Sequence, residues 1–75
     1  MEEIKIKTDF IKLDSLLKLA GACSTGAEAK FHIKSGEVKV NGLVEIRRGK
    51  KIRSSDEVEF NGNKYKVLIN IGDVH

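Results

Sequence analysis

The chain has 75 residues, a formal net charge of +3, one cysteine and few aromatic side chains. This length allows one small domain with a single aliphatic core and leaves no room for a second core. A single cysteine excludes an intramolecular disulfide, the N-terminus lacks the pattern of a signal peptide, and no apolar run reaches transmembrane length. We therefore expect residues 1–75 to form one soluble, cytoplasmic domain without a membrane segment.

The positive charge is concentrated in the middle third of the sequence. Residues 1–29 carry four Lys and five acids, residues 30–53 carry eight Lys or Arg and two acids, and residues 54–75 carry two Lys and four acids. The corresponding net charges are −1, +6 and −2. A local excess of this sign attracts phosphate backbones or anionic lipid.

The first third of the chain predicts a strand followed by two helices. Residues 4–7 alternate isoleucine with lysine, as in a short strand at the edge of a sheet. Residues 13–20 repeat apolar side chains at helical spacing, so we expect a helix of about two turns with Gly21 as its C-cap. Asp14 lies in the first turn of this helix, where the helix dipole favours a negative charge.

A second helix is predicted between an N-cap at Thr25 and a C-cap at Gly36. Its start is indicated by Thr25 and Glu28, which have the spacing of a capping box. We expect its core-facing residues to be Ala29, Ile33 and, as a third candidate, Phe31. The lysines Lys30 and Lys34 are four residues apart and should share one exposed face.

A hairpin and a basic loop follow. Val38 and Val40 should face the core with Lys39 on the other side, and Asn41-Gly42 is a typical tight turn. The return strand carries Leu43, Val44 and Ile46. The segment 47–53 then places five cations within seven residues with no acid among them: Arg47, Arg48, Lys50, Lys51 and Arg53. We expect this loop to meet a polyanion rather than to pack in a core.

The last third predicts a second hairpin. A turn at 54–56 precedes an alternating strand at 57–60, a second Asn-Gly turn at 61–62 and a return strand at 65–69. Residues 70–75 are expected to be a loose tail. The order strand, helix, helix and four strands predicts an α+β domain, with two short helices packed on a small, mainly antiparallel sheet.

These residues together resemble the S4 RNA-binding domain family over residues 11–60. The similarity rests on a basic-Leu-Asp start, an apolar helix ending in Gly, a Ser/Thr-capped helix with Ala and a basic residue, a Gly-x-Val-x-Val-Asn-Gly run and a final turn before a strand. These are Lys12-Leu13-Asp14, Leu16-Leu17, Gly21, Thr25, Ala29-Lys30, Gly36 to Gly42 and Ser55-Asp56. More narrowly, Thr25-Gly26, Ala29-Lys30, Glu45, Arg47-Arg48-Gly49 and Lys51 resemble the stand-alone bacterial S4-like proteins of the YaaA/YbcJ type.

The resemblance implies an αL-motif fold and a non-catalytic protein that binds structured ribosomal or transfer RNA through backbone and shape. Many S4 domains have Ser-Arg where this chain has Thr25-Gly26, so Lys30 and Lys34 are expected to supply that contact. The candidate RNA-binding residues are Lys12, Thr25, Gly26, Lys30, Lys34, Lys39, Arg47, Arg48, Lys50, Lys51 and Arg53. Two alternatives stay open: an adaptor that docks on an acidic protein, ribosomal or other, and a helix-turn-helix that binds DNA.

Catalytic and metal-binding signals are weak. The sequence has no Cys/His set with metal spacing and no nucleophile with a paired base, so we expect neither an enzyme nor a cofactor. Cys23 is expected to be a buried apolar residue, His32 a surface or half-buried helix residue, and the aromatic side chains parts of the core.

Overall fold

The computed structural model describes residues 1–69. In this range the chain forms two helices, α1 (Leu13–Leu19) and α2 (Gly26–Lys34), and seven strands. The strands are β1 (Glu2–Ile6), β2 (Ile11–Lys12), β3 (Val38–Val40), β4 (Leu43–Val44), β5 (Lys51–Ile52), β6 (Glu57–Phe60) and β7 (Asn63–Ile69). The tail predicted at 70–75 lies outside the described residues.

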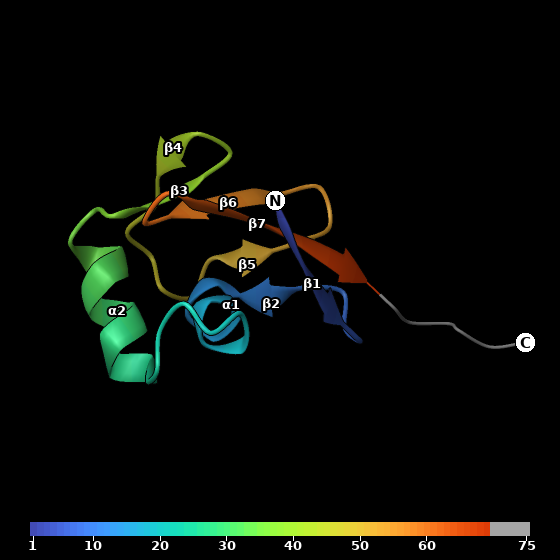
Figure 1. The fold of residues 1–75 in the computed structure, drawn as a ribbon, viewed down its shortest axis with the longest axis horizontal. Helices are drawn as coiled ribbons and strands as arrows, with labels where there is room; N and C mark the ends of the chain where they lie inside the picture. The colour runs from blue at the N-terminus through green and yellow to red at the C-terminus, as the bar shows by residue number, and fades with distance from the viewer. Residues whose placement is uncertain (70–75) are drawn as a thin grey trace, which may run out of the picture.

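Five strands form one sheet in the order β1-β7-β6-β3-β4. The pairs β7–β6, β6–β3 and β3–β4 are antiparallel, whereas β1 pairs with β7 in parallel. The predicted edge strand is therefore confirmed as β1. Both helices and a separate two-stranded sheet, β2–β5, lie on one side of this larger sheet (Figure 1). The α+β fold expected from the sequence is confirmed.

Both helices end as predicted, at a glycine with positive φ. Gly21 (φ 77°) donates its amide to Lys18, and the following Ala22 donates to Leu17. Gly36 (φ 81°) and Glu37 make the same pair of bonds at the end of α2. These are Schellman motifs, in which only glycine adopts the left-handed conformation without strain.

The core lies between the larger sheet and the helices. Leu13, Leu16 and Leu17 of α1 are fully buried, as are Ala29 and Ile33 of α2. The sheet contributes Ile4, Ile6, Val38, Val40, Val58, Phe60, Tyr65 and Val67. The prediction of a core position for Phe31 is wrong: its side chain is 64% exposed, because two residues along a helix rotate it to the side opposite Ile33.

Both Asn-Gly turns have the predicted backbone. Asn41 and Gly42 have φ values of 54° and 84°, and Asn61 and Gly62 have 55° and 81°. Asn41 is also tied to the next strand, since its backbone amide donates to the Glu57 carbonyl and its side-chain oxygen accepts from the Glu57 amide. Its side-chain nitrogen donates to Asp56 at 2.9 Å. The first turn therefore fixes the start of β6 as well as its own hairpin.

The structure differs from the sequence-based expectation at the segment 43–53. The return strand β4 ends at Val44, so Leu43, Val44 and Ile46 are all more than half exposed. The segment 47–53 is not a free loop either, because Lys51–Ile52 forms β5 and Ile52 is fully buried. The pairing of β5 with β2 supplies a partner from a distant part of the sequence: Ile11 lies opposite Ile52, 41 residues away.

Replacing Gly42 with valine should destabilise the fold by about 1 kcal/mol or more, because a β-branched side chain at positive φ is strained. The space around Gly42 is open, so this strain is the main effect. The measurement is a melting curve beside Gly49→Ala, a control whose added Cβ also meets open space without positive φ. An unchanged melting temperature for Gly42→Val would contradict the positive-φ turn.

Candidate nucleic-acid interface

The basic segment 47–53 is held against the N-terminus of α1. The Leu13 amide donates to the Lys50 carbonyl at 2.9 Å, and the Asp14 amide donates to the Arg48 carbonyl at 3.1 Å. The first amides of a helix have no partner within the helix, so these carbonyls satisfy them. The side chain of the N-cap residue, Lys12, makes no capping hydrogen bond. The start of α1 and the basic segment therefore position each other.

Two arginines of this segment contact acids. Arg47 makes a bidentate pair with Glu45, through Nε at 2.9 Å and Nη2 at 3.1 Å, and its backbone amide donates to the same carboxylate. These hydrogen bonds lower the pKa of Glu45 to about 2. Arg48 lies near Asp14, with Nη1 and Oδ2 3.9 Å apart. The segment itself contains no acid, but Glu45 and Asp14 from outside it offset part of its charge, most clearly for Arg47.

A row of cations crosses the exposed side of the two helices. Asp14 and Lys18 are one turn apart on α1, and the stem of Lys18 reaches the N-terminus of α2, 4.0 Å from where a Cβ on Gly26 would lie. Gly26, Lys30 and Lys34 follow at intervals of four residues along one side of α2. We call Lys18, Lys30, Lys34 and Arg48 the helical basic face.

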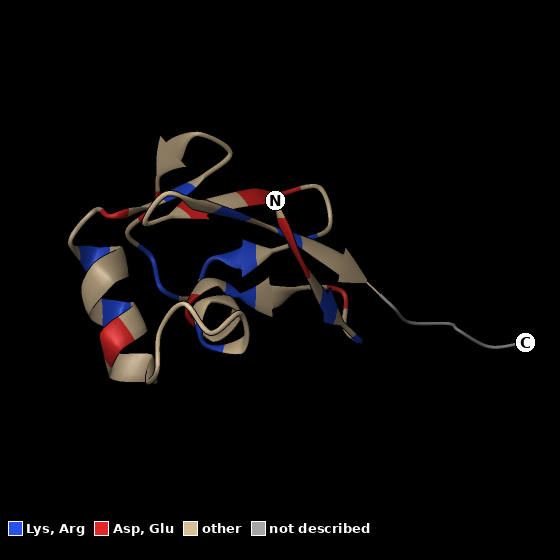
Figure 2. Cartoon of the chain, viewed as in Figure 1, with Lys and Arg blue, Asp and Glu red and all other residues tan. Residues whose placement is uncertain are grey.

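The helical basic face contains a residue that the sequence analysis missed. Lys18 lies outside the basic middle third, but its position four residues after Asp14 could have indicated that it faces the same way. Within residues 1–69 no ion pair involves Lys18, Lys30 or Lys34. Figure 2 shows the corresponding basic positions on α2 and on the segment between β4 and β5, on the side of the sheet that carries the helices.

A second basic group lies on the small sheet. Lys12 and Lys51 are directly opposite each other across β2 and β5, an arrangement that destabilises a strand pair when no anion is present. Lys51 and Arg53 both lie over the ring of Phe10, with Nζ 4.9 Å and Cζ 5.4 Å from its centroid. We call Lys12, Lys51 and Arg53 the small-sheet group.

The outer face of the larger sheet, in contrast, is balanced in charge. In register, Glu59 lies between Lys39 and Lys64, and Glu57 lies opposite Lys66. Lys64 also approaches Glu57 to 4.0 Å. The structure therefore separates Lys39 from the other candidate residues, because it faces away from the helices and has an acidic neighbour.

The family model of the S4 domain matches residues 4–68. The chain belongs to the S4 domain family. It is 42% identical over 62 residues to "Putative RNA-binding protein YbcJ" of Escherichia coli (strain K12), covering 83% of this chain and 89% of the relative. It is also 41% identical over 59 residues to "Probable ribosome maturation protein RlbA" of Bacillus subtilis (strain 168), covering 79% and 83%.

A solved structure has the same fold. The solution structure of YbcJ from E. coli, described as revealing an αL motif involved in RNA binding, matches with a TM-score of 0.69 and 39% sequence identity. The match covers 91% of this chain and 87% of that one. The expected resemblance to stand-alone S4-like proteins of this type is confirmed.

The N-terminus of α2 in this S4 domain has an internal cap. The Thr25 hydroxyl accepts the Glu28 amide at 3.1 Å, and the Glu28 carboxylate accepts the Ser24 amide at 2.6 Å. The capping-box prediction is confirmed for Thr25, with the return bond shifted by one residue to Ser24. The Glu28 carboxylate would repel a phosphate at the same helix end. Phosphate contact at Thr25 and Gly26 stays a prediction.

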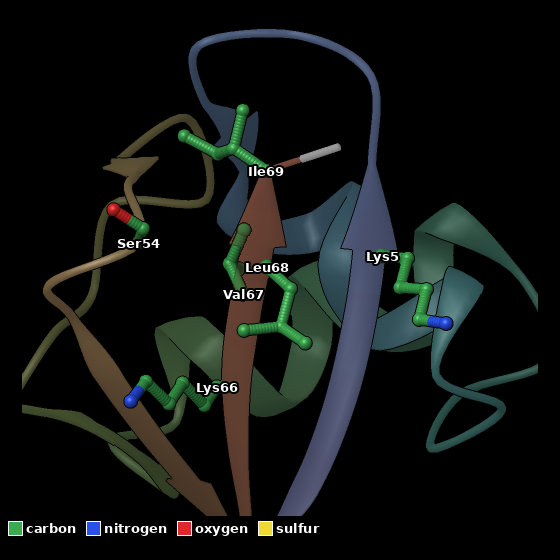
Figure 3. Close-up of a pocket in the computed structure, with 6 residues that line it drawn as sticks. All are labelled: Lys5, Ser54, Lys66, Val67, Leu68 and Ile69. Atoms are coloured by element: carbon green, nitrogen blue, oxygen red, sulfur yellow. The ribbon is translucent and has the colours of Figure 1, made fainter. Parts of the chain in front are cut away.

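A hollow of about 610 Å³ lies beside the C-terminal part of β7, lined by Lys5, Ser54 and residues 66–69. Its two lysines, Lys5 and Lys66, extend in opposite directions (Figure 3). Because the charges do not converge on one point, this hollow offers no anion site. It lies apart from the helical basic face of the S4 domain.

The remaining candidates in the S4 domain fit structural roles. Cys23 is buried. Burial, and to a lesser extent the nearby Glu28 and Glu37 carboxylates, raise the pKa of its thiol, which opposes reactivity. His32 is half-buried and its Nδ1 lies 3.0 Å from Glu37.

Among residues 1–69 no group of three or more His, Cys, Asp or Glu side chains could hold a metal ion. Neither of the two described helices has the length and apolarity needed to cross a bilayer.

Proposed function

We propose that this protein binds structured RNA, without catalysis, by placing phosphates of the RNA backbone along the helical basic face and the small-sheet group. The observation that carries the proposal is the unequal distribution of charge. Cations of the helical basic face line one side of the molecule, whereas lysines on the outer sheet alternate with acids. Phosphate contacts of this kind position a protein on RNA, and RNA shape then gives selectivity.

The names of the relatives support the same function. One is named for RNA binding and another for ribosome maturation, and the solved relative is described by an RNA-binding motif. We infer that the RNA is ribosomal, and that the protein acts in the cytoplasm where ribosomes mature. Besides the two basic groups, Lys50 lies beside the start of α1, and Arg47 is the candidate whose charge Glu45 offsets.

RNA affinity should fall steeply with salt. If about four to six phosphates are neutralised, the logarithm of the binding constant should fall with the logarithm of salt concentration with a slope of about −3 to −5. The measurement is a titration of a ribosomal RNA fragment at several salt concentrations, beside a DNA duplex of equal length. An affinity that does not change with salt would contradict phosphate-dominated binding. Equal or tighter binding to the DNA duplex would favour the helix-turn-helix alternative.

A further inference from the structure

The exposed side of α2 carries a large aromatic side chain. Phe31 is 64% exposed and lies opposite the buried Ala29 and Ile33, so it contributes little to the core. Its ring meets the His32 ring edge-on, with centroids 5.3 Å apart, and His32 in turn packs on the buried Phe60 at 5.1 Å. An exposed aromatic ring is thus connected to the core through a second ring, which restricts its movement.

The surroundings of Phe31 are apolar at the centre and cationic at the rim. A shallow hollow of about 380 Å³ is lined by Ala27, Lys30, Phe31, Lys34 and Ser35. The Ser35 hydroxyl already donates to the Phe31 carbonyl at 2.8 Å. No acid lines this hollow, and the two lysines belong to the helical basic face. An occupant should therefore have a flat apolar face and negative charge on its edges.

An unpaired nucleotide has this chemistry. Aromatic side chains in RNA-binding proteins stack on unstacked bases, while nearby cations hold the phosphates on either side. A fully paired helix could reach Lys30 and Lys34, but its bases would not be free to stack on Phe31. We propose that Phe31 stacks on an unpaired base of the bound RNA, with Lys30 and Lys34 on the adjacent phosphates. This inference rests on the proposed function and deepens it.

The test compares two stem–loop RNAs that differ by one base. One probe has a single bulged adenosine, and the other has an abasic residue at the same place, with the same number of phosphates. The protein should bind the adenosine probe at least about fivefold more tightly, the lower range for stacking of one base. Phe31→Leu keeps an apolar side chain without an aromatic face, so it should lose this preference and keep its binding to the abasic probe.

Fluorescence gives an independent measurement, because the chain has no tryptophan. Phe31→Trp should keep the preference for adenosine, and its emission should be quenched by the adenosine probe and not by the abasic probe. The matched control is Leu43→Trp, at a position that is 74% exposed and lies on the hairpin rather than on α2. This control should show no quenching that depends on the adenosine.

Three results would overturn the inference. Equal binding of both probes by the unmodified protein would mean that no unpaired base is stacked, while the proposed function would stand. A preference for adenosine that survives in Phe31→Leu would assign the stacking to another residue. Failure to bind either probe or any ribosomal RNA would overturn the proposed function together with the inference.

Discussion

Replacing Lys18 and Arg48 together with alanine should weaken RNA binding about tenfold or more, if each charge-assisted contact contributes about 1 kcal/mol. Arg48 lies 3.9 Å from Asp14, and Lys18 follows Asp14 by one turn of α1. Both are exposed, so stability should change by no more than about 0.5 kcal/mol. A melting curve and an RNA titration on the same double variant measure the two effects separately.

The matched control is the double variant Lys64→Ala/Lys66→Ala. It removes the same amount of charge from the outer face of the sheet, where Glu57 and Glu59 are neighbours. Its RNA affinity should change much less than that of the first variant. If both double variants lose affinity equally, binding depends on net charge alone, and the helical basic face is not the site.

Arg47 provides a second comparison, because it is adjacent in sequence to Arg48 and differs in its partners. Its guanidinium is held by both oxygens of Glu45, so the pair presents little net charge to RNA. Replacing Arg47 and Glu45 together with alanine removes no net charge and should therefore reduce RNA affinity less than Arg48→Ala. Sequence alone treats the two arginines as equivalent, and only the folded arrangement of Glu45 and Asp14 separates them.

The elements whose signals are local were predictable from the sequence. The Asn-Gly turns need positive φ at two successive residues, a requirement of backbone sterics that does not depend on the rest of the fold. The same holds for the ends of both helices at Gly21 and Gly36. The family resemblance rested on these same local features, which is why it identified the fold correctly.

Features that depend on distant partners were not predictable. The strands β2 and β5 contain two residues each, too few for a period, and exist because Ile11 and Ile52 meet across the chain. The contact between Lys18 and Gly26 likewise depends on how α1 and α2 pack.

Ile46 and Ile52 show this limit most directly, since they are six residues apart and chemically identical. The sequence placed Ile46 in a strand and Ile52 in a basic loop. In the fold, Ile46 is 57% exposed, whereas Ile52, a residue of the small sheet, is fully buried. Alternation and composition predicted the opposite order of burial for the two residues. The burial of each depends on which distant strand pairs with its segment.

Ile52→Ala should therefore destabilise the protein by about 2–5 kcal/mol, through lost burial and the cavity left behind. A domain of this length has a total stability of roughly 4–11 kcal/mol, so the melting temperature should fall by at least about 10 °C. Ile46→Ala, the same substitution on the surface, should change stability by no more than about 0.5 kcal/mol. Thermal unfolding of the two variants side by side is the measurement.

The consequence for function follows from where Ile52 lies. It anchors β5 between Lys51 and Arg53, and the same segment supplies the carbonyls that bind the first amides of α1. At a temperature where Ile52→Ala remains folded, its RNA affinity should stay within about threefold of the unmodified protein, since no cation has been removed. Similar melting temperatures for Ile46→Ala and Ile52→Ala would show that β5 does not hold the basic segment. The cations would then be positioned by the RNA itself when it binds.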